Sequence, residues 1–289
     1  MKVFFDSRQS VKSNDSFSPS AQKSGELAKQ WKDRQLPVSI EPFRPAARRD
    51  LYRVHDRSYV DGVLDLQRAN GYGNKSEAVA KSLPWVVGSF LSAVKHSIET
   101  GENSWSLTSG AHHAHYTHGG GFCTFNFLML GALLAVEMGS RRTVLLDFDR
   151  HDPDGCRDIQ ERIEVQSLEI YSFGEQPIRN VSDSERWLAN LPSTLLGLCD
   201  GADLILYNAG VDPAETDPLG GVMTKDQMRR RDRLVFETAL AFDAPVSVSL
   251  AGGYSKDADG SIQPTLDLHT QTLVECLSVS SVLKRRELL

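Results

Sequence analysis

The chain has 289 residues, with 40% hydrophobic and 24% charged side chains, which is ordinary for a globular protein of one large domain or two smaller ones. Its net charge of −6 argues against a nucleic-acid or anionic-membrane binder, and no apolar run reaches the roughly 20 residues of a membrane-spanning helix. The four cysteines are widely spaced and form no CxxC pair, so we expect reduced thiols in a cytoplasmic protein.

Strands and helices are predicted to alternate along the chain. Apolar runs predict strands at residues 2–5, 104–108, 143–147, 165–172, 202–208 and 245–250. Helices are predicted at residues 21–34, 50–68, 84–100, 126–138, 154–163, 183–198, 224–242 and 266–284. Pro84 is expected in the first turn of its helix, and Thr224 is expected to cap the helix that follows it. This alternation predicts a mainly parallel sheet with helices on both faces, in a single domain over residues 1–289.

The segment that ends the predicted strand at residues 143–147 is the most informative in the chain. It reads Asp-Phe-Asp-Arg-His-Asp-Pro-Asp over residues 147–154. Because alternate side chains of an extended backbone share a face, Asp147, Asp149 and His151 start on one side, where they could hold a divalent cation. A polar loop with an aspartate helix cap is the alternative that this segment alone leaves open.

Further polar loops follow other predicted strands. They are residues 109–115 with His112 and His113, residues 208–217 with Asp212, and residues 251–254 with Tyr254. In a parallel sheet, such loops meet at the edge where the carboxyl ends of the strands lie. Taken singly, a histidine pair can be structural and Asp212 can be a turn residue. Together the loops suit metal-assisted hydrolysis, in which a metal activates water, a histidine takes the proton and a donor stabilises the oxyanion.

Read together, these segments resemble the signatures of zinc-dependent histone deacetylases, a family that includes bacterial acetylpolyamine amidohydrolases and acetoin-utilisation proteins. The matching segments are SGAHHA at 109–114, GGGFCTFN at 119–126, LDFDRH at 146–151, GVD at 210–212, DPLG at 217–220 and GGY at 252–254. The segment VHDRSYV at 54–60 resembles an early His-x-x-x-Tyr helix of the family, to which we assign a structural role. The matches run in family order from about residue 50 to residue 255.

The resemblance implies an arginase/deacetylase-like fold, which is a three-layer α/β/α sandwich. It also implies one zinc ion, bound by Asp149, His151 and Asp212. Fe²⁺ or Co²⁺ could replace zinc in such a site, because metal choice in the cell follows availability as well as affinity. In many relatives a structural monovalent cation lies nearby, and here Asp147 would help to hold a K⁺ ion.

The resemblance implies a role for each remaining residue of the set. His112 and His113 would bind and deprotonate the attacking water and protonate the leaving amine. Asp147 would orient His112, and Asp154 would orient His113, because such carboxylates fix the tautomer and basicity of a histidine. Tyr254 would donate its hydroxyl to the substrate carbonyl and then to the oxyanion. The residues implied to line the acyl-lysine tunnel are Gly121 and Phe122.

The chain departs from the family pattern around these motifs. His151 is followed by Asp152, where the family often has a second histidine that is not a zinc ligand, so zinc binding is expected to survive. Residues 108–111 (TSGA) replace the Arg-Pro-x-Gly segment before the histidine pair, nearer the style of the class IV deacetylases. His115 and His118 are additional histidines, which could affect specificity at the pocket rim or could be solvated loop residues.

We therefore predict a zinc-dependent amidohydrolase that removes an acyl group, most simply acetyl, from an amine. A compact chain without an evident protein-docking extension favours a small acylated amine such as an acetylpolyamine, and protein acyl-lysine is the alternative substrate. A ureohydrolase of the arginase type with two manganese ions is a second alternative, although it would need Asp-x-His-x-Asp. A non-catalytic binding protein is a third. We expect no nucleic-acid or membrane partner, and the sequence leaves a homo-oligomer open.

Overall fold

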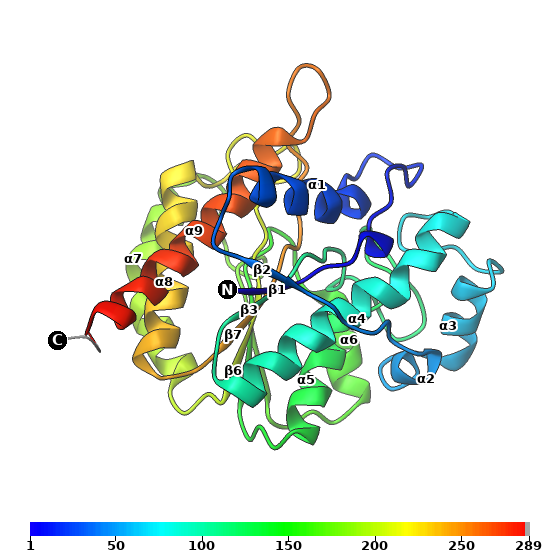
Figure 1. Ribbon diagram of the computed structural model, residues 1–289, viewed down its shortest axis with the longest axis horizontal. Coiled ribbons are helices and arrows are strands. Elements are labelled where there is room, and N and C mark those ends of the chain that lie inside the picture. The colour runs from blue at the N-terminus through cyan, green and yellow to red at the C-terminus, as the bar shows by residue number, and fades with distance from the viewer. Residues whose placement is uncertain (287–289) are drawn as a thin grey trace.

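A seven-stranded sheet forms the centre of the computed structural model, which describes residues 1–286, with side chains through residue 281 (Figure 1). The strands are β1 (Lys2–Phe4), β2 (Ser39–Glu41), β3 (Ser104–Ser106), β4 (Thr143–Asp147), β5 (Leu168–Ser172), β6 (Leu204–Asn208) and β7 (Val246–Ser249). Their order in the sheet is β2-β1-β3-β7-β6-β4-β5, and every neighbouring pair is parallel. The prediction of a mainly parallel α/β sheet is confirmed.

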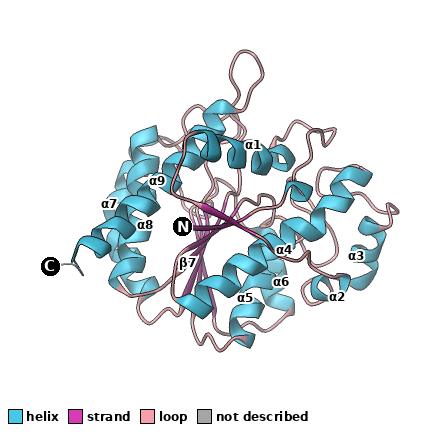
Figure 2. Ribbon diagram, viewed as in Figure 1, coloured by secondary structure: helices cyan, strands magenta, loops and turns pink. Residues whose placement is uncertain are grey.

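Helices cover both faces of the sheet and complete the three layers, as Figure 2 shows. One face is covered by α1 (Ser20–Asp33), α7 (Val181–Cys199), α8 (Lys225–Ala241) and α9 (Gln263–Arg286). The other is covered by α4 (Glu77–Thr100), α5 (Phe127–Glu137) and α6 (Asp154–Arg162). The short helices α2 (Arg48–Leu51) and α3 (Arg57–Leu64) lie beside α4, and a 3₁₀ turn, η1 (Ser7–Gln9), precedes α1.

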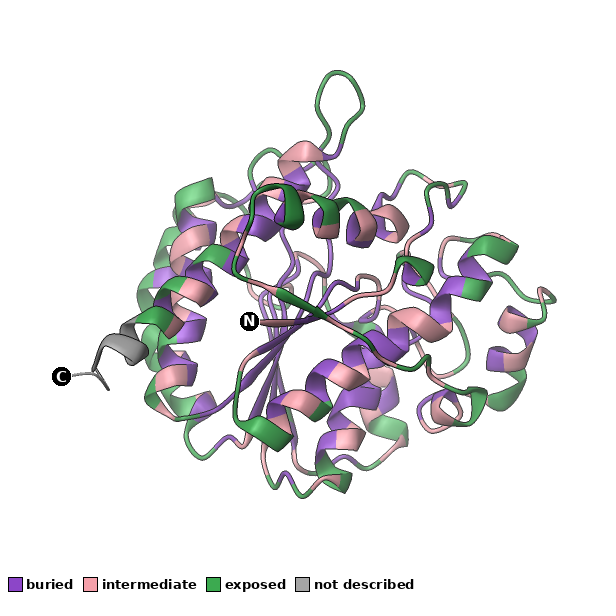
Figure 3. Cartoon of the chain, in the orientation of Figure 1, coloured by how far each residue is buried: buried purple, intermediate pink, exposed green. Residues whose placement is uncertain are grey.

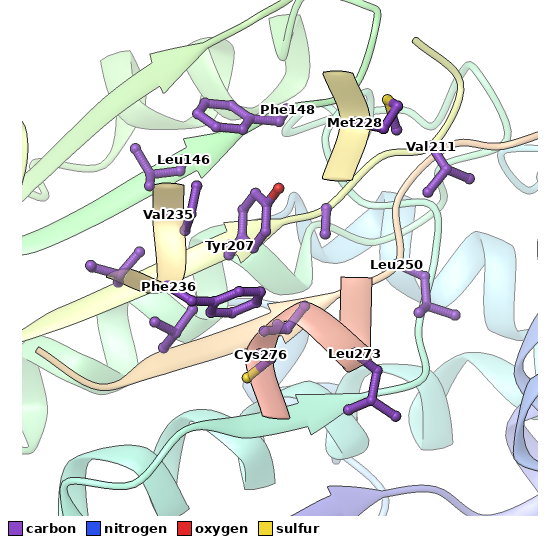
Figure 4. Packing of buried hydrophobic residues seen from close by; sticks show 14 of the residues in the cluster. Leu146, Phe148, Tyr207, Val211, Met228, Val235, Phe236, Leu250, Leu273 and Cys276 are labelled. Carbon is purple, nitrogen blue, oxygen red and sulfur yellow. The ribbon is translucent and has the colours of Figure 1, made fainter. Parts of the chain in front are cut away.

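Alternate residues of the strands belong to two separate hydrophobic cores, one on each face of the sheet. In β4, Val144 and Leu146 pack with α7 and α8, whereas Leu145 packs with α5 and α6. This follows from the two-residue period of a strand. Strands buried on both faces read as continuous apolar runs, which is why the central strands were visible in the sequence. Figure 3 shows the buried sheet between helices with exposed outer faces, and Figure 4 shows the packing of Leu146 and Phe236 in the first core.

The predicted helix over residues 50–68 is wrong, because the chain breaks it into α2 and α3. Asp56 accepts a hydrogen bond from the Tyr59 N–H and so caps α3. The N–H of Asp56 itself donates to the Tyr116 carbonyl at 2.8 Å, instead of to a carbonyl one turn earlier. A contact with a distant loop therefore overrides the helical pattern of this segment.

The predicted start of the next helix at Pro84 is also wrong. Helix α4 begins at Glu77, where the side chain of Ser76 accepts from the Val79 N–H, so Pro84 lies inside the helix. A proline there removes one helical hydrogen bond at a cost of about 3 kcal/mol, which the buried face of α4 must offset. Strand β2, a three-residue edge strand that pairs with β1, was not predicted.

All four cysteines are buried and free, as expected of thiols that fill core positions. In the part of the chain that the structure describes, no helix combines the length and the hydropathy that crossing a bilayer requires.

Candidate metal centre

The register of the sheet brings the polar loops together. Asp147, the last residue of β4, is aligned with Ser172 of β5 on one side and with Asn208 of β6 on the other. Asn208 is in turn aligned with Ser249 of β7. The loops that follow β4, β6 and β7 therefore leave the sheet at one level and on one edge, where ligands bind in open α/β sheets.

Asp149, His151 and Asp212 come together at this edge. One ligand atom from each lies within 4.8 Å of the others, and they are the one such group among the residues that the structure describes. His151 Nδ1 lies 3.0 Å from Asp149 Oδ1 and 3.1 Å from Asp212 Oδ2. The two carboxylates are fully buried, whereas 38% of the His151 side chain is exposed. The group is thus open to solvent on the histidine side.

Backbone N–H groups hold the two carboxylates in place. Asp149 Oδ2 accepts from the Gly252 N–H at 2.8 Å, and Asp212 Oδ1 accepts from the Arg150 N–H at 3.0 Å. Each bond joins loops that follow different strands. A Cβ atom on Gly252 would lie 2.4 Å from Asp212 Oδ2 and 2.6 Å from Asp149 Oδ2, so only glycine fits between the carboxylates.

The electrostatics of the group favour a cation. Burial and the neighbouring Asp149 raise the pKa of Asp212 to about 7, because two buried carboxylates repel each other. Asp149 and Asp212, as hydrogen-bond acceptors, raise the pKa of His151 to about 10. Without a metal, a proton on His151 neutralises part of the negative charge. A divalent cation bound to one nitrogen and two carboxylate oxygens would do so more completely, and this donor set suits zinc.

Two histidine–carboxylate pairs flank the group. His112 Nδ1 donates to the buried Asp147 Oδ2 at 3.0 Å, and its Nε2 faces Asp149 Oδ1 at 3.6 Å. Burial lowers the pKa of His112, but the carboxylates of Asp149 and Asp147 outweigh it and raise this pKa to about 9. His113 Nδ1 donates to Asp154 Oδ1 at 2.6 Å, and burial together with His112 lowers the pKa of His113. The two imidazoles, 4.0 Å apart between ring centroids, therefore differ in proton affinity.

Tyr254 is the last residue of the predicted catalytic set, and hydrogen bonds to its backbone hold it in place. The carboxylate of Asp217 accepts from the Tyr254 N–H at 2.7 Å and from the Ser255 N–H at 3.1 Å. The ring is buried, and it lines a small, partly open pocket together with His112 and Asp149. Burial and the nearby Asp149 raise the pKa of Tyr254 well above its ordinary value, so the phenol keeps its proton and can donate it in a hydrogen bond.

The two predicted tunnel residues lie beside these groups. Gly121 and Phe122 both have left-handed backbones, with φ of 52° and 66°. A Cβ on Gly121 would lie 2.4 Å from His113 Cδ2, so this position cannot hold a larger residue without moving the histidine. The centroid of the Phe122 ring lies 5.6 Å from that of the Tyr254 ring, and the half-exposed Phe17 stacks on Tyr254 at 6.2 Å between centroids. The Tyr254 ring is therefore in contact with two other aromatic rings.

His55 is hydrogen bonded to the loop that carries His112 and His113. Its Nε2 accepts from the Asn126 N–H at 2.8 Å, so its Nδ1 carries the proton and donates to the His115 carbonyl at 2.9 Å. Burial lowers the pKa of His55 to about 4, which keeps it neutral.

The two additional histidines, His115 and His118, stack on each other with 4.4 Å between ring centroids. His115 Nε2 lies 3.6 Å from Asp154 Oδ2.

Sequence reasoning missed two buried cations behind the site. Lys23 of α1 is fully buried and donates to the Ala251 carbonyl at 2.6 Å, next to the glycine pair before Tyr254. Burial lowers the pKa of Lys23 to about 8. Arg231 of α8 is fully buried as well. The available signal was a charged residue on the apolar stripe of an amphipathic helix, which indicates a buried polar partner.

Comparison with known proteins places this geometry in context. Residues 19–178 match the family described as "Histone deacetylase domain", a stretch that includes the histidine pair and ends before Asp212 and Tyr254. An uncharacterized protein of Picosynechococcus sp. is 31% identical over 229 residues, which are 72% of this chain and 76% of that protein. Histone deacetylase 2 of Arabidopsis thaliana is 28% identical over 269 residues, which are 82% of this chain and 68% of that protein.

Among solved structures, acetylpolyamine aminohydrolase from Burkholderia pseudomallei superposes on this chain with a TM-score of 0.74 at 16% identity. The superposition covers 96% of this chain and 99% of that chain. The two chains therefore share a fold over nearly their whole lengths.

Proposed function

Since the chain belongs to the histone deacetylase family, we propose that it is a zinc-dependent amidohydrolase that removes an acyl group from an amine. The observation that carries this proposal is the convergence of Asp149, His151 and Asp212 with two histidine–carboxylate pairs and a buried tyrosine. Amide hydrolysis needs a polarised carbonyl, an activated water and a proton for the leaving amine. The site offers a group for each need.

Zinc suits the three proposed ligands, because catalytic zinc sites keep three protein ligands of nitrogen and oxygen type and one open position. When bound, zinc would polarise the substrate carbonyl and lower the pKa of a water molecule. The exposed side of His151 is where substrate and water can reach it. We also propose a structural K⁺ beside Asp147, whose buried carboxylate ends β4.

The two histidines divide the proton transfers in this proposal. His112 faces the ligand group and is held by the buried carboxylate of Asp147. Its pKa of about 9 is that of the metal-free site, and a bound cation that offsets the charge of Asp149 would lower it, so that His112 could accept the proton of the attacking water. His113 is held by Asp154, which is half exposed, and lies nearer the solvent-side His151. It is therefore suited to take up a proton from solvent and pass it to the departing amine, and its lowered pKa makes the protonated form a good acid.

Tyr254 supplies the hydrogen bond to the carbonyl oxygen. Its proton is retained because its pKa is raised, and Asp217 fixes the loop that carries it. A donor placed before the reaction stabilises the developing oxyanion without the cost of reorganising water.

The exposed charges on the loops that carry the proposed ligands and Tyr254 support a cationic substrate. On the loops that follow β4, β6 and β7, the exposed charged residues are Asp152, Glu215, Lys256, Asp257 and Asp259. Carboxylates thus outnumber the single ammonium, and a field of this sign attracts positively charged substrates. We propose a small acylated polyamine, whose remaining ammonium groups would meet these carboxylates. Acyl-lysine in a basic protein is the second candidate, and the similarity to Histone deacetylase 2 favours testing it.

The first experiment measures hydrolysis by the zinc-loaded protein of acetyl-lysine peptide, long-chain acyl-lysine peptide, N-acetylputrescine and N-acetylspermidine. Each reaction is repeated with a chelator. We expect chelator-sensitive turnover of the acetylpolyamines. Turnover confined to the peptides would replace the small-amine substrate by protein acyl-lysine. No turnover of any substrate by protein that holds one zinc per chain would contradict the proposed activity, and two manganese ions per chain would point to ureohydrolase chemistry instead.

Metal binding is expected to weaken as the pH falls. Asp149 and Asp212 raise the pKa of metal-free His151 to about 10, so this ligand carries a proton at neutral pH, which the metal must displace. Between pH 8 and pH 6 the apparent zinc affinity should therefore fall by roughly tenfold per unit for the proton on His151, and more steeply below about pH 7, where Asp212 also takes up a proton. Competition titrations against a chelator at several pH values measure this slope. A zinc affinity that does not change over this range would contradict His151 as a ligand.

A further inference from the structure

Arg231 lies directly behind the proposed ligand loops. It belongs to α8, and none of its side chain is exposed. A guanidinium remains charged at any pH that a folded protein tolerates, and its charge is costly to bury. The groups that it contacts therefore indicate why it stays in the core.

On the side of the site, Arg231 bonds to two backbone carbonyls. Its terminal nitrogen Nη1 donates to the Phe148 carbonyl at 3.2 Å and to the Gly210 carbonyl at 2.8 Å. Phe148 precedes the proposed ligand Asp149, and Gly210 lies two residues before Asp212. One nitrogen atom thus links the two loops that supply the carboxylate ligands.

On the other side, Arg231 is anchored to Asp232. Its Nε donates to Asp232 Oδ1 at 2.8 Å, while Nη2 lies 2.7 Å from the same oxygen in a geometry that makes an ion pair but no hydrogen bond. The Asp232 carboxylate accepts from the hydroxyls of Tyr207 at 2.5 Å and Thr272 at 2.7 Å. Asp232 therefore anchors the side chain of Arg231, which joins the two carbonyls, to β6 and α9. Figure 4 shows Tyr207 and Phe148 in this packing, with their rings 5.5 Å apart.

The two loops touch where Arg231 joins them. A Cβ atom on Gly210 would lie 2.6 Å from Asp149 Cα, so the backbones are already at contact distance. A small displacement of either loop would move one carboxylate relative to the other. The positive charge of Arg231 also lies close enough to the buried Asp212 for the two groups to attract each other.

We infer that Arg231 is a positioning residue of the metal centre, which sets the spacing of Asp149 and Asp212 by bridging the backbone of their loops. The inference rests on the proposed function, because it takes these two aspartates as metal ligands. Residues that orient metal ligands from behind raise metal affinity without touching the metal. Arg231 would do so through main-chain carbonyls and a fixed charge.

The test is the metal affinity of an Arg231→Lys variant. Lysine keeps the charge but has a single nitrogen, which cannot reach both carbonyls and Asp232 in the geometry of the guanidinium. We expect the dissociation constant for Zn²⁺, measured by chelator competition, to rise by about 10- to 100-fold. We also expect an altered visible absorption spectrum of the Co²⁺-loaded variant, because its ligand geometry changes. Both measurements are made well below the melting temperature of each protein.

Arg233→Lys is the matched control. Arg233 lies on the same helix and pairs with Glu275 at 2.7 Å, away from the ligand loops. This variant should bind zinc like the parent protein, and an equal loss in both variants would contradict the inference. If Arg231→Lys does not fold, Tyr207→Phe takes its place, since it removes one of the two hydroxyls that hold Asp232. That variant should bind zinc several-fold more weakly, with unchanged far-ultraviolet circular dichroism.

The outcomes separate the two proposals. A parent protein that binds neither Zn²⁺ nor Co²⁺ would contradict the proposed function itself. A parent protein that binds both metals, with folded Arg231→Lys or Tyr207→Phe variants of equal affinity and identical Co²⁺ spectra, would contradict only the role of Arg231. Weaker binding and a changed spectrum in these variants, with Arg233→Lys unaffected, would support it.

Discussion

Asp149→Ala and His151→Ala variants are expected to lose bound zinc and to hydrolyse the best substrate on the order of 1,000-fold more slowly, since the metal contributes several kcal/mol of transition-state stabilisation. Each change removes one of the three atoms that lie within 4.8 Å of one another. Two ligands hold zinc too weakly to survive dilution in the assay. Metal content after desalting and kcat/KM on the same sample measure both effects.

Asp152→Ala serves as the control for these variants. Asp152 is an exposed carboxylate directly after His151, so its loss changes the charge of the same loop without removing a proposed ligand. We expect full zinc content and at most a modest rise in KM for cationic substrates. If either ligand variant keeps full activity, the assignment of the metal centre is wrong. If Asp152→Ala also loses zinc, the ligand set must be enlarged.

Tyr254→Phe is expected to lower kcat by about 100- to 1,000-fold while leaving the zinc content unchanged, because one oxyanion donor is typically worth this much. The ring is buried and packs against Phe122 and Phe17, so phenylalanine fits the same space. The Asp217 carboxylate bonds to the backbone of residue 254 and not to its hydroxyl, so the loop should keep its place. The loss would therefore report on the hydroxyl alone.

Tyr171→Phe is the matched control for the loss of a hydroxyl. The Tyr171 hydroxyl accepts from Trp187 Nε1 at 2.9 Å in the core beside α7, and we expect this variant to keep wild-type turnover. Steady-state kinetics with metal analysis distinguish the possible results. Wild-type turnover in Tyr254→Phe would remove the tyrosine from the mechanism. A loss of zinc in that variant would reassign it to the support of the metal centre.

Local patterns were sufficient to locate most elements. The strands β4 and β6 are buried on both faces, so each is a continuous apolar run that ends in polar residues. The start of α8 was placed correctly, after the side-chain cap of Thr224. The misplaced start of α4 and the break between α2 and α3 came from segments in which tertiary contacts offset a proline or redirected a backbone N–H.

The roles of several buried polar residues could not be read from the sequence. Lys23 contacts a carbonyl 228 residues away, and Asp217 holds the backbone of Tyr254 from 37 residues away. Each is part of a helix or turn whose local pattern is satisfied without that contact. A charge on an apolar helix stripe indicates that some partner is buried with it, but the pattern carries no information on which partner.

The sequence by itself determined the alternation of strands and helices, the parallel sheet and the identity of the residues at the strand ends, because these depend on short-range periodicity and on side-chain chemistry. Only the tertiary structure decided the distances among Asp149, His151 and Asp212, the different proton affinities of His112 and His113, and the bridge that Arg231 makes. Those properties arise from burial and from contacts between loops that the sheet brings to one edge, and neither exists until the chain has folded.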